Sequence, residues 1–452
     1  MFLRKMSACV IINKKLILEV FIMNKKKRFV QVGVGGRARF FYTALASTYS
    51  DTSEITAFCD INRTRLEYAK KTLVEEYGYP EVALYGADEF DKMIEEQKPD
   101  CVIVTSVDRT HHKYIIRAME LGCDVLSEKP MTMNAEKCQD ILDAVKRTGK
   151  NLRVSFNYRY APHNTLVRKL IRDGVIGDVK QVHFEWMLST SHGADYFRRW
   201  HRDKRNSGGL LVHKATHHFD LVNFWLNTKP KQVFSYGDLM FYGRENAENR
   251  GKTDFYYRST GAANAKDDPF AIDLTSNEGW KKLYYDAEGD DGYLRDQSVW
   301  GDGISIEDVM NVLVKYESGA IMSYSLNAFS PCEGFKVSFT GTKGRMEVNV
   351  TEAIYMNAGG DAKLEGAAKQ RSVKVFPQFA EPYEVEIPVG IGGHGGGDPI
   401  LLNDLFGTPE YDEFHRAASH IDGAMSILTG VAANKSIASG MPINIRDLVR
   451  FD

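Results

Sequence analysis

The stretch from Phe29 to Asp60 begins with Phe29-Val30-Gln31-Val32-Gly33-Val34-Gly35-Gly36-Arg37-Ala38. An apolar run, residues 29–32, leads through these glycines into a segment of helical composition from Phe40 to Ser47. A second apolar run, residues 55–59, follows and ends at Asp60. The order strand, glycine turn, helix, strand and acidic residue predicts the first unit of an α/β fold.

Each part of this pattern suits the binding of a dinucleotide. Gly33 allows a tight turn, Gly35 lets the backbone approach a pyrophosphate, and Ala38 keeps the helix close to the sheet. The pyrophosphate would lie at the helix N-terminus, where unpaired N–H groups and the positive end of the dipole point at it. A glycine turn that binds nothing is the alternative. The flanking strands and Asp60, about twenty residues further on, favour the binding site.

The carboxylate of Asp60 also predicts which dinucleotide is preferred. It can accept hydrogen bonds from ribose hydroxyls, and it would repel a 2'-phosphate. We therefore expect NAD rather than NADP as the cofactor, with Arg63 nearby weakening this preference.

Alternating helices and strands continue to about residue 155. Residues 101–105 form a continuous apolar run, which is typical of a strand buried on both faces of a parallel sheet. Asn134 is a good N-cap for a helix that reaches Thr148. The alternation predicts a doubly wound, parallel Rossmann sheet over residues 28–155.

The rest of the chain, residues 156–452, shows strands that follow one another with few helices between them. One helix is expected at about residues 209–226. This pattern predicts an α+β substrate-binding domain with an open, mostly antiparallel sheet, so the fold class is α/β followed by α+β. The strands are expected at residues 179–188, 232–236, 309–316, 320–326, 336–340 and 345–350.

A polar segment without a clear period, residues 238–308, interrupts the second domain. Four acidic residues in it do not match a calcium loop of about 12 residues, so we expect a solvated loop. A long ordered insertion usually covers a site or builds a subunit contact. The acidic residues are Asp286, Glu288, Asp290 and Asp291.

The two ends of the chain lie outside these patterns. Residues 1–27 are interpreted as an N-terminal extension, since residues 1–22 mix apolar and charged pieces that suit neither a signal peptide nor a membrane span. Translation is expected to begin at Met23. Near the other end, residues 414–436 are expected to form an amphipathic helix that packs back on the first domain.

Composition narrows the class of protein. At 452 residues the chain can bury two substantial cores. A formal net charge of -2 marks it neither as a nucleic-acid binder nor as a membrane-surface protein. Its six cysteines include no CxxC pair and suggest buried thiols in a reducing compartment, so a cytoplasmic location is expected.

The last strand but one of the first domain ends in Glu128-Lys129-Pro130. Ligands of open α/β sheets lie beyond the carboxyl ends of the strands, so Lys129 is expected near the nicotinamide end of the cofactor. Burial and a neighbouring cation disfavour a charged lysine, which suits it to exchange a proton with a substrate hydroxyl. A surface lysine before a proline is the alternative.

The second domain contains a dense group of polar residues that begins after Gly208-Gly209. His213, His217 and Asp220 are spaced by four and three residues, which would place them on one face of a helix. This spacing also suits zinc, but a metal site needs a further close ligand, for which sequence offers only candidates such as His394. Proton transfer is the favoured interpretation over zinc or a structural histidine cluster.

Taken together, these segments resemble the Gfo/Idh/MocA family, the relatives of glucose-fructose oxidoreductase and inositol dehydrogenase. The resemblance covers nearly the whole chain from Lys27. The segments that carry it are Gly33-x-Gly35-x-x-Ala38, Thr105-Ser106-Val107-Asp108-Arg109-Thr110-His111, Glu128-Lys129-Pro130, and Gly208-Gly209 followed by His213, His217 and Asp220.

The resemblance implies that Lys129 and His217 act at the substrate carbon that exchanges hydride with NAD, with His217 as general base. In the family an aspartate stands four residues before this histidine, whereas this chain has His213. It therefore stays open whether a carboxylate polarises His217. The expected cofactor contacts are Gly33, Gly35, Arg37, Ala38, Asp60, Ser106, His111, Glu128, Lys129 and Asn157. The expected substrate contacts are Tyr158, Arg159, Arg202, His213, Lys214, Asp220 and His394, the last in a glycine-rich segment.

Three functions remain open at this stage. The first is a dehydrogenase that uses NAD to oxidise a hydroxyl of a sugar, polyol or glycoside. The second is a glycoside hydrolase or lyase that retains NAD and reduces its intermediate again. The third is a non-catalytic, NAD-dependent sensor, against which the presence of Lys129 and His217 argues. A small carbohydrate is the expected partner, with a homo-oligomer formed through the C-terminal sheet and no bound metal.

Overall fold

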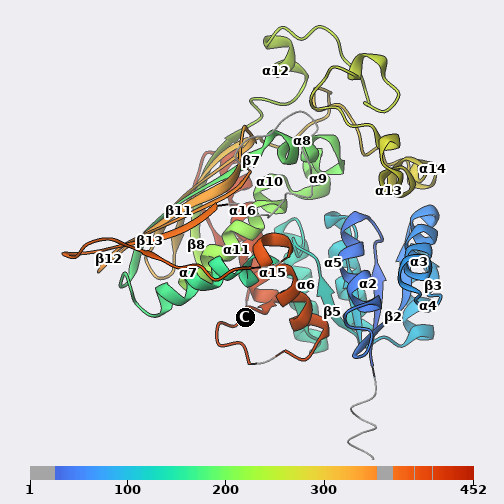
Figure 1. The fold of residues 1–452 in the computed structure, drawn as a ribbon, viewed down its shortest axis with the longest axis horizontal. Helices are drawn as coiled ribbons and strands as arrows, with labels where there is room; N and C mark the ends of the chain where they lie inside the picture. Colours follow the sequence, from blue (N-terminus) through green and yellow to red (C-terminus); the bar gives the residue numbers. More distant parts are fainter. Residues whose placement is uncertain (1–25, 354–369, 391, 410, 452) are drawn as a thin grey trace, which may run out of the picture.

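The structure is a computed structural model that describes residues 26–353, 370–390, 392–409 and 411–451. The chain forms two domains that lie side by side, each built on its own sheet (Figure 1). Most of the expected N-terminal extension, including Met23, lies outside the described residues. Among the helices of the described part, none is long and apolar enough to cross a membrane.

The first sheet has seven strands in the order β15-β6-β5-β4-β1-β2-β3. All neighbours pair in parallel except β15, which pairs antiparallel with β6. This order confirms the predicted doubly wound Rossmann sheet. Its elements are β1 (Lys27–Val32), α2 (Arg39–Ala46), β2 (Ser53–Asp60), α3 (Arg63–Tyr77), β3 (Ala83–Gly86), α4 (Phe90–Gln97), β4 (Cys101–Val104), α5 (His111–Glu120), β5 (Asp124–Ser127), α6 (Ala135–Thr148), β6 (Leu152–Val154) and β15 (Ala418–Ser419).

Local sequence explains where these elements begin and end. All of β4 is buried, as expected for a strand covered on both faces. The side chain of Asn134 caps α6 by accepting a hydrogen bond from the Lys137 N–H, and Asn62 caps α3 in the same way. Both helices end at a glycine with a left-handed backbone, Gly149 and Gly78.

The second sheet has nine strands in the order β14-β13-β12-β11-β7-β10-β9-β8-β16. Among the neighbouring strands of the described residues, only β7 and β10 run parallel, so the prediction of a mostly antiparallel sheet is confirmed. Its elements are β7 (Val179–Ser189), β8 (Pro230–Asp238), β9 (Val309–Tyr316), β10 (Ile321–Ser330), β11 (Glu333–Gly341), β12 (Gly344–Ala353), β13 (Gln370–Pro377), β14 (Tyr383–Val385) and β16 (Ile443–Asn444).

Buried and solvent-facing residues alternate along this sheet, as β9 shows most clearly. One face packs against helices, while Tyr236, Leu313 and Ile321 are exposed on the strands β8, β9 and β10. Oligomer formation through this sheet stays a prediction. The helices of the second domain are α7 (Pro162–Arg172), α8 (Thr190–Arg198), α9 (Lys204–Ser207), α10 (Leu210–His213), α11 (Ala215–Leu226), α12 (Arg244–Asn249), α13 (Glu278–Trp280), α14 (Glu288–Asp291), α15 (Gly393–Phe406) and α16 (His420–Ser439).

The helix expected at residues 209–226 is in fact two helices. α10 ends at His213, and α11 begins at Ala215, with Lys214 between them. The expectation that His213, His217 and Asp220 share one face of a single helix is therefore wrong. The backbone break lets His213 and His217 meet different partners.

The C-terminal region joins the two domains. α16 begins at His420, six residues later than expected, because the preceding residues Ala418–Ser419 add β15 to the first sheet. The helix packs mainly on α11 and β8 of its own domain and also contacts α6 and β6. Phe406, at the end of α15, is buried in the core of the first domain, where its ring meets Phe29 at a centroid distance of 5.1 Å.

The insertion between β8 and β9 extends over the top of the first domain, where α13 and α14 lie above α3 (Figure 1). Of its four acidic residues, Asp286 and Asp290 are exposed as expected, whereas Glu288 and Asp291 are largely buried in ion pairs, which corrects the loop interpretation for these two. Glu288 forms two hydrogen bonds of 2.7 Å with Arg258 inside the insertion, and Asp291 pairs with Arg65 of α3. Tyr284, Asp291 and Tyr293 of the insertion line the cavity between the domains, which is in line with the expectation that such a segment covers a site.

Candidate active site

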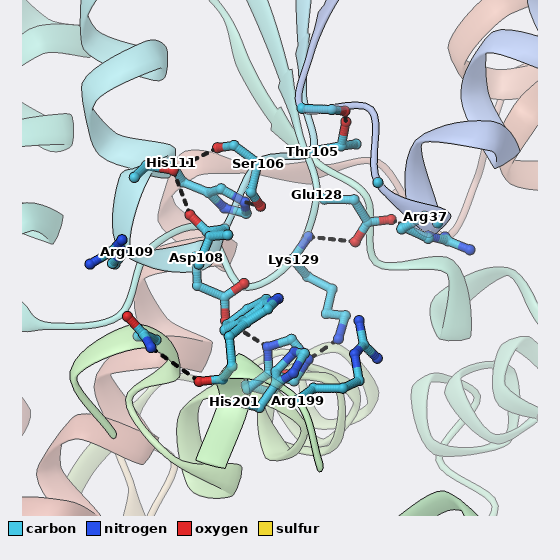
Figure 2. A pocket seen from close by; sticks show the side chains of 18 of the residues that line it. Arg37, Thr105, Ser106, Asp108, Arg109, His111, Glu128, Lys129, Arg199 and His201 are labelled. Atoms are coloured by element: carbon cyan, nitrogen blue, oxygen red, sulfur yellow. Dashed lines mark hydrogen bonds and ion pairs between the residues drawn. The ribbon is translucent and has the colours of Figure 1, made fainter. Parts of the chain in front are cut away.

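A cavity of about 490 Å³ lies between the domains, beyond the carboxyl ends of β1, β4 and β5. Side chains from both domains converge on it, with Lys129 pointing from the first domain toward the helices of the second (Figure 2). Nearly all predicted cofactor contacts line it: Gly33, Gly35, Arg37, Asp60, Ser106, His111, Glu128, Lys129 and Asn157. From the second domain the predicted residues Tyr158, His213, Lys214, His217 and His394 also line it.

The glycine turn is shaped by close packing on one side and open space on the other. Gly33 has a φ of +84°, and a Cβ there would lie 2.5 Å from the Ser106 backbone nitrogen. No atom of the described residues lies within 4 Å of a Cβ built at Gly35. Ala38 is fully buried and does not line the cavity, in keeping with its expected role in packing. At Gly35 the turn thus presents bare backbone to the cavity, as a pyrophosphate requires.

Asp60, at the end of β2, is held by the turn itself. Its Oδ2 accepts a hydrogen bond of 2.7 Å from the Val34 N–H, and its Oδ1 accepts one of 2.9 Å from the Asn62 N–H. Burial raises the pKa of Asp60, against the opposing effect of these two N–H groups. The nearby arginine of the cavity is Arg65, whereas Arg63 is exposed and pairs with Glu67, so the predicted influence of Arg63 is corrected.

His111 and Glu128 support the cavity wall through contacts inside the protein. His111 is buried, with its ring nitrogens 2.8 Å from the Pro130 carbonyl and 2.9 Å from the Ser106 carbonyl. Glu128 accepts a 2.6 Å hydrogen bond from Arg37 and a 2.8 Å bond from the Lys129 N–H. Both ring nitrogens and both carboxylate oxygens are engaged, so these residues position the loops that surround a ligand.

Asn157 tests whether the residues present fit a dinucleotide. Its Nδ2 donates a 2.9 Å hydrogen bond to Asp398, which fixes the orientation of the amide because a carboxylate only accepts. The Oδ1 is buried and has no hydrogen-bond partner among the described residues. Buried polar atoms are rarely left unpaired. This acceptor and the open backbone at Gly35 fit a dinucleotide, which Gly33, Gly35, Asp60 and Asn157 would hold.

Lys129 and His217 reach the cavity from opposite domains. The Lys129 Nζ donates a hydrogen bond of 3.3 Å to the His213 carbonyl. The His217 ring is 5 % exposed and stacks on Tyr158 with 4.4 Å between centroids, and its Nδ1 has no partner among the described residues. Burial, followed by the charges of Lys129 and Lys214, lowers the pKa of His217 well below its usual value. His217 is therefore neutral and able to accept a proton.

A carboxylate does lie near Lys129 and His217, but it belongs to Asp108, to which the sequence analysis assigned no function. Asp108 lies in the loop after β4. Its Oδ2 is hydrogen-bonded to the Nδ1 of His213, with 2.6 Å between the two atoms. Burial raises the pKa of Asp108 well above its usual value and lowers that of His213. The pair links the two domains, and the Lys129 Nζ donates to the backbone carbonyl of the same His213; Figure 2 shows Asp108 near Lys129. The partner of Asp108 is thus His213, not His217.

Three of the predicted substrate contacts do not line the cavity. Arg159 forms a buried ion pair with Asp220, with bonds of 2.7 and 2.5 Å, and also reaches Asp422 at 3.0 Å. Arg202 donates to the carbonyls of Ser298 and Asp302 and so anchors the insertion. The side chains of Arg159, Asp220 and Arg202 form hydrogen bonds within the protein and lie outside the cavity lining, which corrects the expectation that they bind substrate.

The structure adds cavity residues that sequence reasoning missed. Several come from α8 and the short helical turn after it, where the sequence Arg198-Arg199-Trp200-His201-Arg202 offered a basic and aromatic signal. Arg199 pairs with Asp195 at 3.1 Å and faces the cavity near Lys129 (Figure 2). The added residues include Arg65, Asp108, Arg109, Tyr114, His192, Asp195, Tyr196, Arg199, Trp200, His201 and Asn206, with Tyr284, Asp291 and Tyr293 of the insertion.

The glycine-rich segment before α15 brings His394 to the same cavity. His394 has a φ of 50°, and its Nδ1 lies 2.8 Å from Asp398. A Cβ at Gly397 would lie 2.6 Å from the Asn157 carbonyl, so the glycines allow a close approach to the protein backbone rather than to a ligand. Among the described residues, no group of three or more potential ligands could hold a metal ion, and Asp220 points to Arg159 instead of joining the histidines.

Comparison with known proteins agrees with this geometry. Residues 27–156 match the model of the oxidoreductase family with an NAD-binding Rossmann fold, and residues 168–445 match that of the family's C-terminal alpha/beta domain. The chain therefore belongs to the Gfo/Idh/MocA family of oxidoreductases, as its motifs predicted. The family places a dinucleotide-binding Rossmann domain at residues 27–156.

Individual relatives match more than nine-tenths of the chain. YteT of Bacillus subtilis, named only as an oxidoreductase, is 35 % identical over 445 residues, covering 94 % of this chain and 99 % of its own. The alpha-N-acetylgalactosaminidase of Tannerella forsythia is 22 % identical over 94 % of this chain and 86 % of its own. The WlbA dehydrogenase of Bordetella pertussis, solved with NADH and UDP-GlcNAcA, matches with a TM-score of 0.60 at 19 % identity, covering 93 % of this chain and 99 % of that chain.

Proposed function

We propose that this protein is an NAD-dependent oxidoreductase that acts on a CH–OH group of a sugar, polyol or glycoside. The observation that carries the proposal is the convergence of Lys129 and His217 on one cavity that also contains the open glycine turn and Asp60. The names of the Tannerella and Bordetella proteins, a glycosidase and a dehydrogenase solved with a sugar nucleotide, support a carbohydrate substrate.

The residues of the chain divide the chemistry between the two domains. A bound nicotinamide dinucleotide supplies the acceptor for the hydride from the substrate carbon. His217, neutral because of burial and nearby lysines, takes the hydroxyl proton as general base. Lys129 hydrogen-bonds the same hydroxyl and orients it toward His217. Tyr158, which stacks on His217 and accepts a 3.4 Å hydrogen bond from Lys214, fixes the plane of the imidazole.

A panel of sugars, polyols and glycosides tests this function, with NADH formation and sugar release scored in parallel. NADH that accumulates with substrate supports a dehydrogenase. Release of sugar from a glycoside without accumulating NADH would instead support the second candidate, a hydrolase or lyase that retains its cofactor. The similarity to the Tannerella glycosidase, which covers 94 % of this chain, supports the hydrolase or lyase as the second candidate function. A protein that binds dinucleotide and turns over nothing in either assay would be a sensor.

The lowered pKa of His217 predicts the position of the acid limb in the pH profile of kcat/KM. A general base loses activity when it is protonated, so activity should persist below the ordinary histidine pKa of about 6.5. Lys214→Met removes one cation that lowers this pKa and should shift the limb toward higher pH. A neutral polyol or sugar substrate keeps substrate ionisation out of the measurement.

Lys229→Met, at an exposed lysine, serves as the control and should leave the profile unchanged. A wild-type limb at or above pH of about 6.5, or a limb that Lys214→Met does not move, would contradict the role of His217.

Asp60→Ala tests the preference for NAD. Removing the carboxylate deletes an acceptor for the ribose hydroxyls and also a negative charge that repels a 2'-phosphate. NAD affinity should therefore fall more than NADP affinity, with the ratio changing by about tenfold, or about 1.4 kcal/mol. Fluorescence titration with NADH and NADPH measures both constants. Asp51→Ala, at an exposed turn residue, is the control, and equal losses for both dinucleotides would refute the argument.

A further inference from the structure

The insertion supplies a wall of the cavity that the family motifs do not describe. We propose that residues 274–293, here called the insertion arm, clasp the bound dinucleotide and slow its release, so that the cofactor stays on the protein between turnovers. This proposal shares one assumption with the proposed function, namely that the cavity binds a dinucleotide, and it does not depend on the reaction. It adds Tyr284 and Asp291 as residues that retain it.

The insertion arm is fastened to the helix that follows Asp60. The Arg65 Nη1 donates a 2.5 Å hydrogen bond to Asp291, and each side chain of this ion pair is 9 % exposed. The Arg65 Nε donates to the Leu283 carbonyl at 3.1 Å. Beside them, the Asn62 amide donates a buried 2.8 Å hydrogen bond to the Ala287 carbonyl. A desolvated, hydrogen-bonded pair of this kind is stronger than an exposed one.

Tyr284 brings the insertion arm onto the glycine turn itself. Its hydroxyl lies 2.7 Å from the position that a Cβ of Gly36 would occupy, and its side chain lines the cavity. Tyr284 belongs to a π-helical stretch, Lys281–Tyr285, a rare geometry that is frequent at functional sites. A phenol hydroxyl over a phosphate-binding turn is a hydrogen-bond donor to the pyrophosphate, in addition to the backbone of the turn.

Asp291 also completes the charge pattern around the ribose. It pairs with Arg65, the arginine that lines the cavity beside Asp60. An arginine engaged by a carboxylate is a poor partner for a 2'-phosphate, so the insertion arm reinforces the discrimination that Asp60 provides. Tyr284 of the insertion arm lies over Gly36, at the pyrophosphate part of the site, and Asp291 holds Arg65 beside Asp60, at the adenosine part. The arm therefore spans both parts. Dinucleotide exchange then requires the Arg65–Asp291 contact to open.

The test is the rate at which NADH leaves the full-length protein. Protein loaded with NADH is mixed with excess NAD, and the decay of NADH fluorescence anisotropy gives the dissociation rate. Asp291→Ala should release NADH at least tenfold faster than the wild type. Tyr284→Phe, which keeps the ring and removes the hydroxyl, should raise the rate severalfold. Asp286→Ala is the matched control, because Asp286 is exposed in the same arm and pairs only with Lys281 among the contacts described.

Equal dissociation rates for wild type, Asp291→Ala and Tyr284→Phe would overturn the proposal, as would an equal acceleration by Asp286→Ala. Thermal melting of each variant shows that the fold is kept, and Tyr284→Phe provides the answer if Asp291→Ala does not fold. The measurement needs no sugar. Slow release that depends on Asp291, in a protein that oxidises no carbohydrate, therefore rejects only the proposed reaction, whereas fast release from an active enzyme rejects only the clasp.

Discussion

Lys129→Met is expected to abolish turnover while the dinucleotide still binds. The side chain reaches the middle of the cavity and contacts the second domain through the His213 carbonyl, but it takes no part in the glycine turn or in the contacts of Asp60. Methionine has a similar length but cannot hydrogen-bond the substrate hydroxyl and orient it toward His217. Without that orientation the contribution of the general base, about 10²–10⁴ in rate, is lost, so kcat/KM should fall by at least that factor.

The comparison is made between substrate turnover and the dissociation constant for NADH, each measured on the same preparation. Lys146→Met, at an exposed lysine near the end of α6, is the control for a lost charge in the same domain. Full activity of Lys129→Met would remove the catalytic assignment. Loss of NADH binding in parallel with activity would make Lys129 a cofactor-binding residue instead.

Asp220→Ala is expected to destabilise the protein by about 3–5 kcal/mol, because it leaves the buried Arg159 with too little compensating charge. The side chains of Asp220 and Arg159 are only 1 % and 3 % exposed, and the pair joins α11 to the segment that links the domains. The remaining partner of Arg159, Asp422, is 37 % exposed and makes a longer contact. Chemical denaturation measures the loss.

The same variant separates a structural role from substrate binding. At a temperature where Asp220→Ala stays folded, its KM should match that of the wild type, since Asp220 does not line the cavity. Asp173→Ala breaks an exposed ion pair with Lys169 and should cost no more than about 1 kcal/mol. A raised KM with unchanged stability would restore Asp220 as a substrate contact.

Motifs with a local physical cause were predictable from the sequence. The glycine turn has a recognisable local pattern, and the positive φ of Gly33 is a local property, although the close Ser106 backbone comes from a distant segment. The apolar strands are recognised from their period alone. Both domains and the family followed from such signals. The carboxyl ends of adjacent parallel strands meet at one edge of the sheet, so the sequence alone also predicted Lys129 at the cavity.

Contacts between distant segments were harder to predict. His213, His217 and Asp220 carry a strong polar signal, but the break at Lys214 decides which of them meet, and sequence spacing assumes an unbroken helix. The pairing of Asp108 with His213 depends on how two domains dock. The insertion has no period because its structure is held by side-chain contacts with α3, which only tertiary packing reveals.

Residues from the far end of the chain finish the nucleotide-binding domain. Phe406 fills its core, Thr52 donates a hydrogen bond of 2.8 Å to the Phe406 carbonyl, and Ala418–Ser419 add the outermost strand beside β6. During synthesis on the ribosome, this domain is therefore incomplete until almost the entire polypeptide has emerged. The first domain can therefore complete its fold only after the second domain has been synthesised. If residues 28–155 were expressed alone, the rings of Phe29, Phe41 and Tyr49 that contact Phe406 would lose this partner and be exposed to solvent.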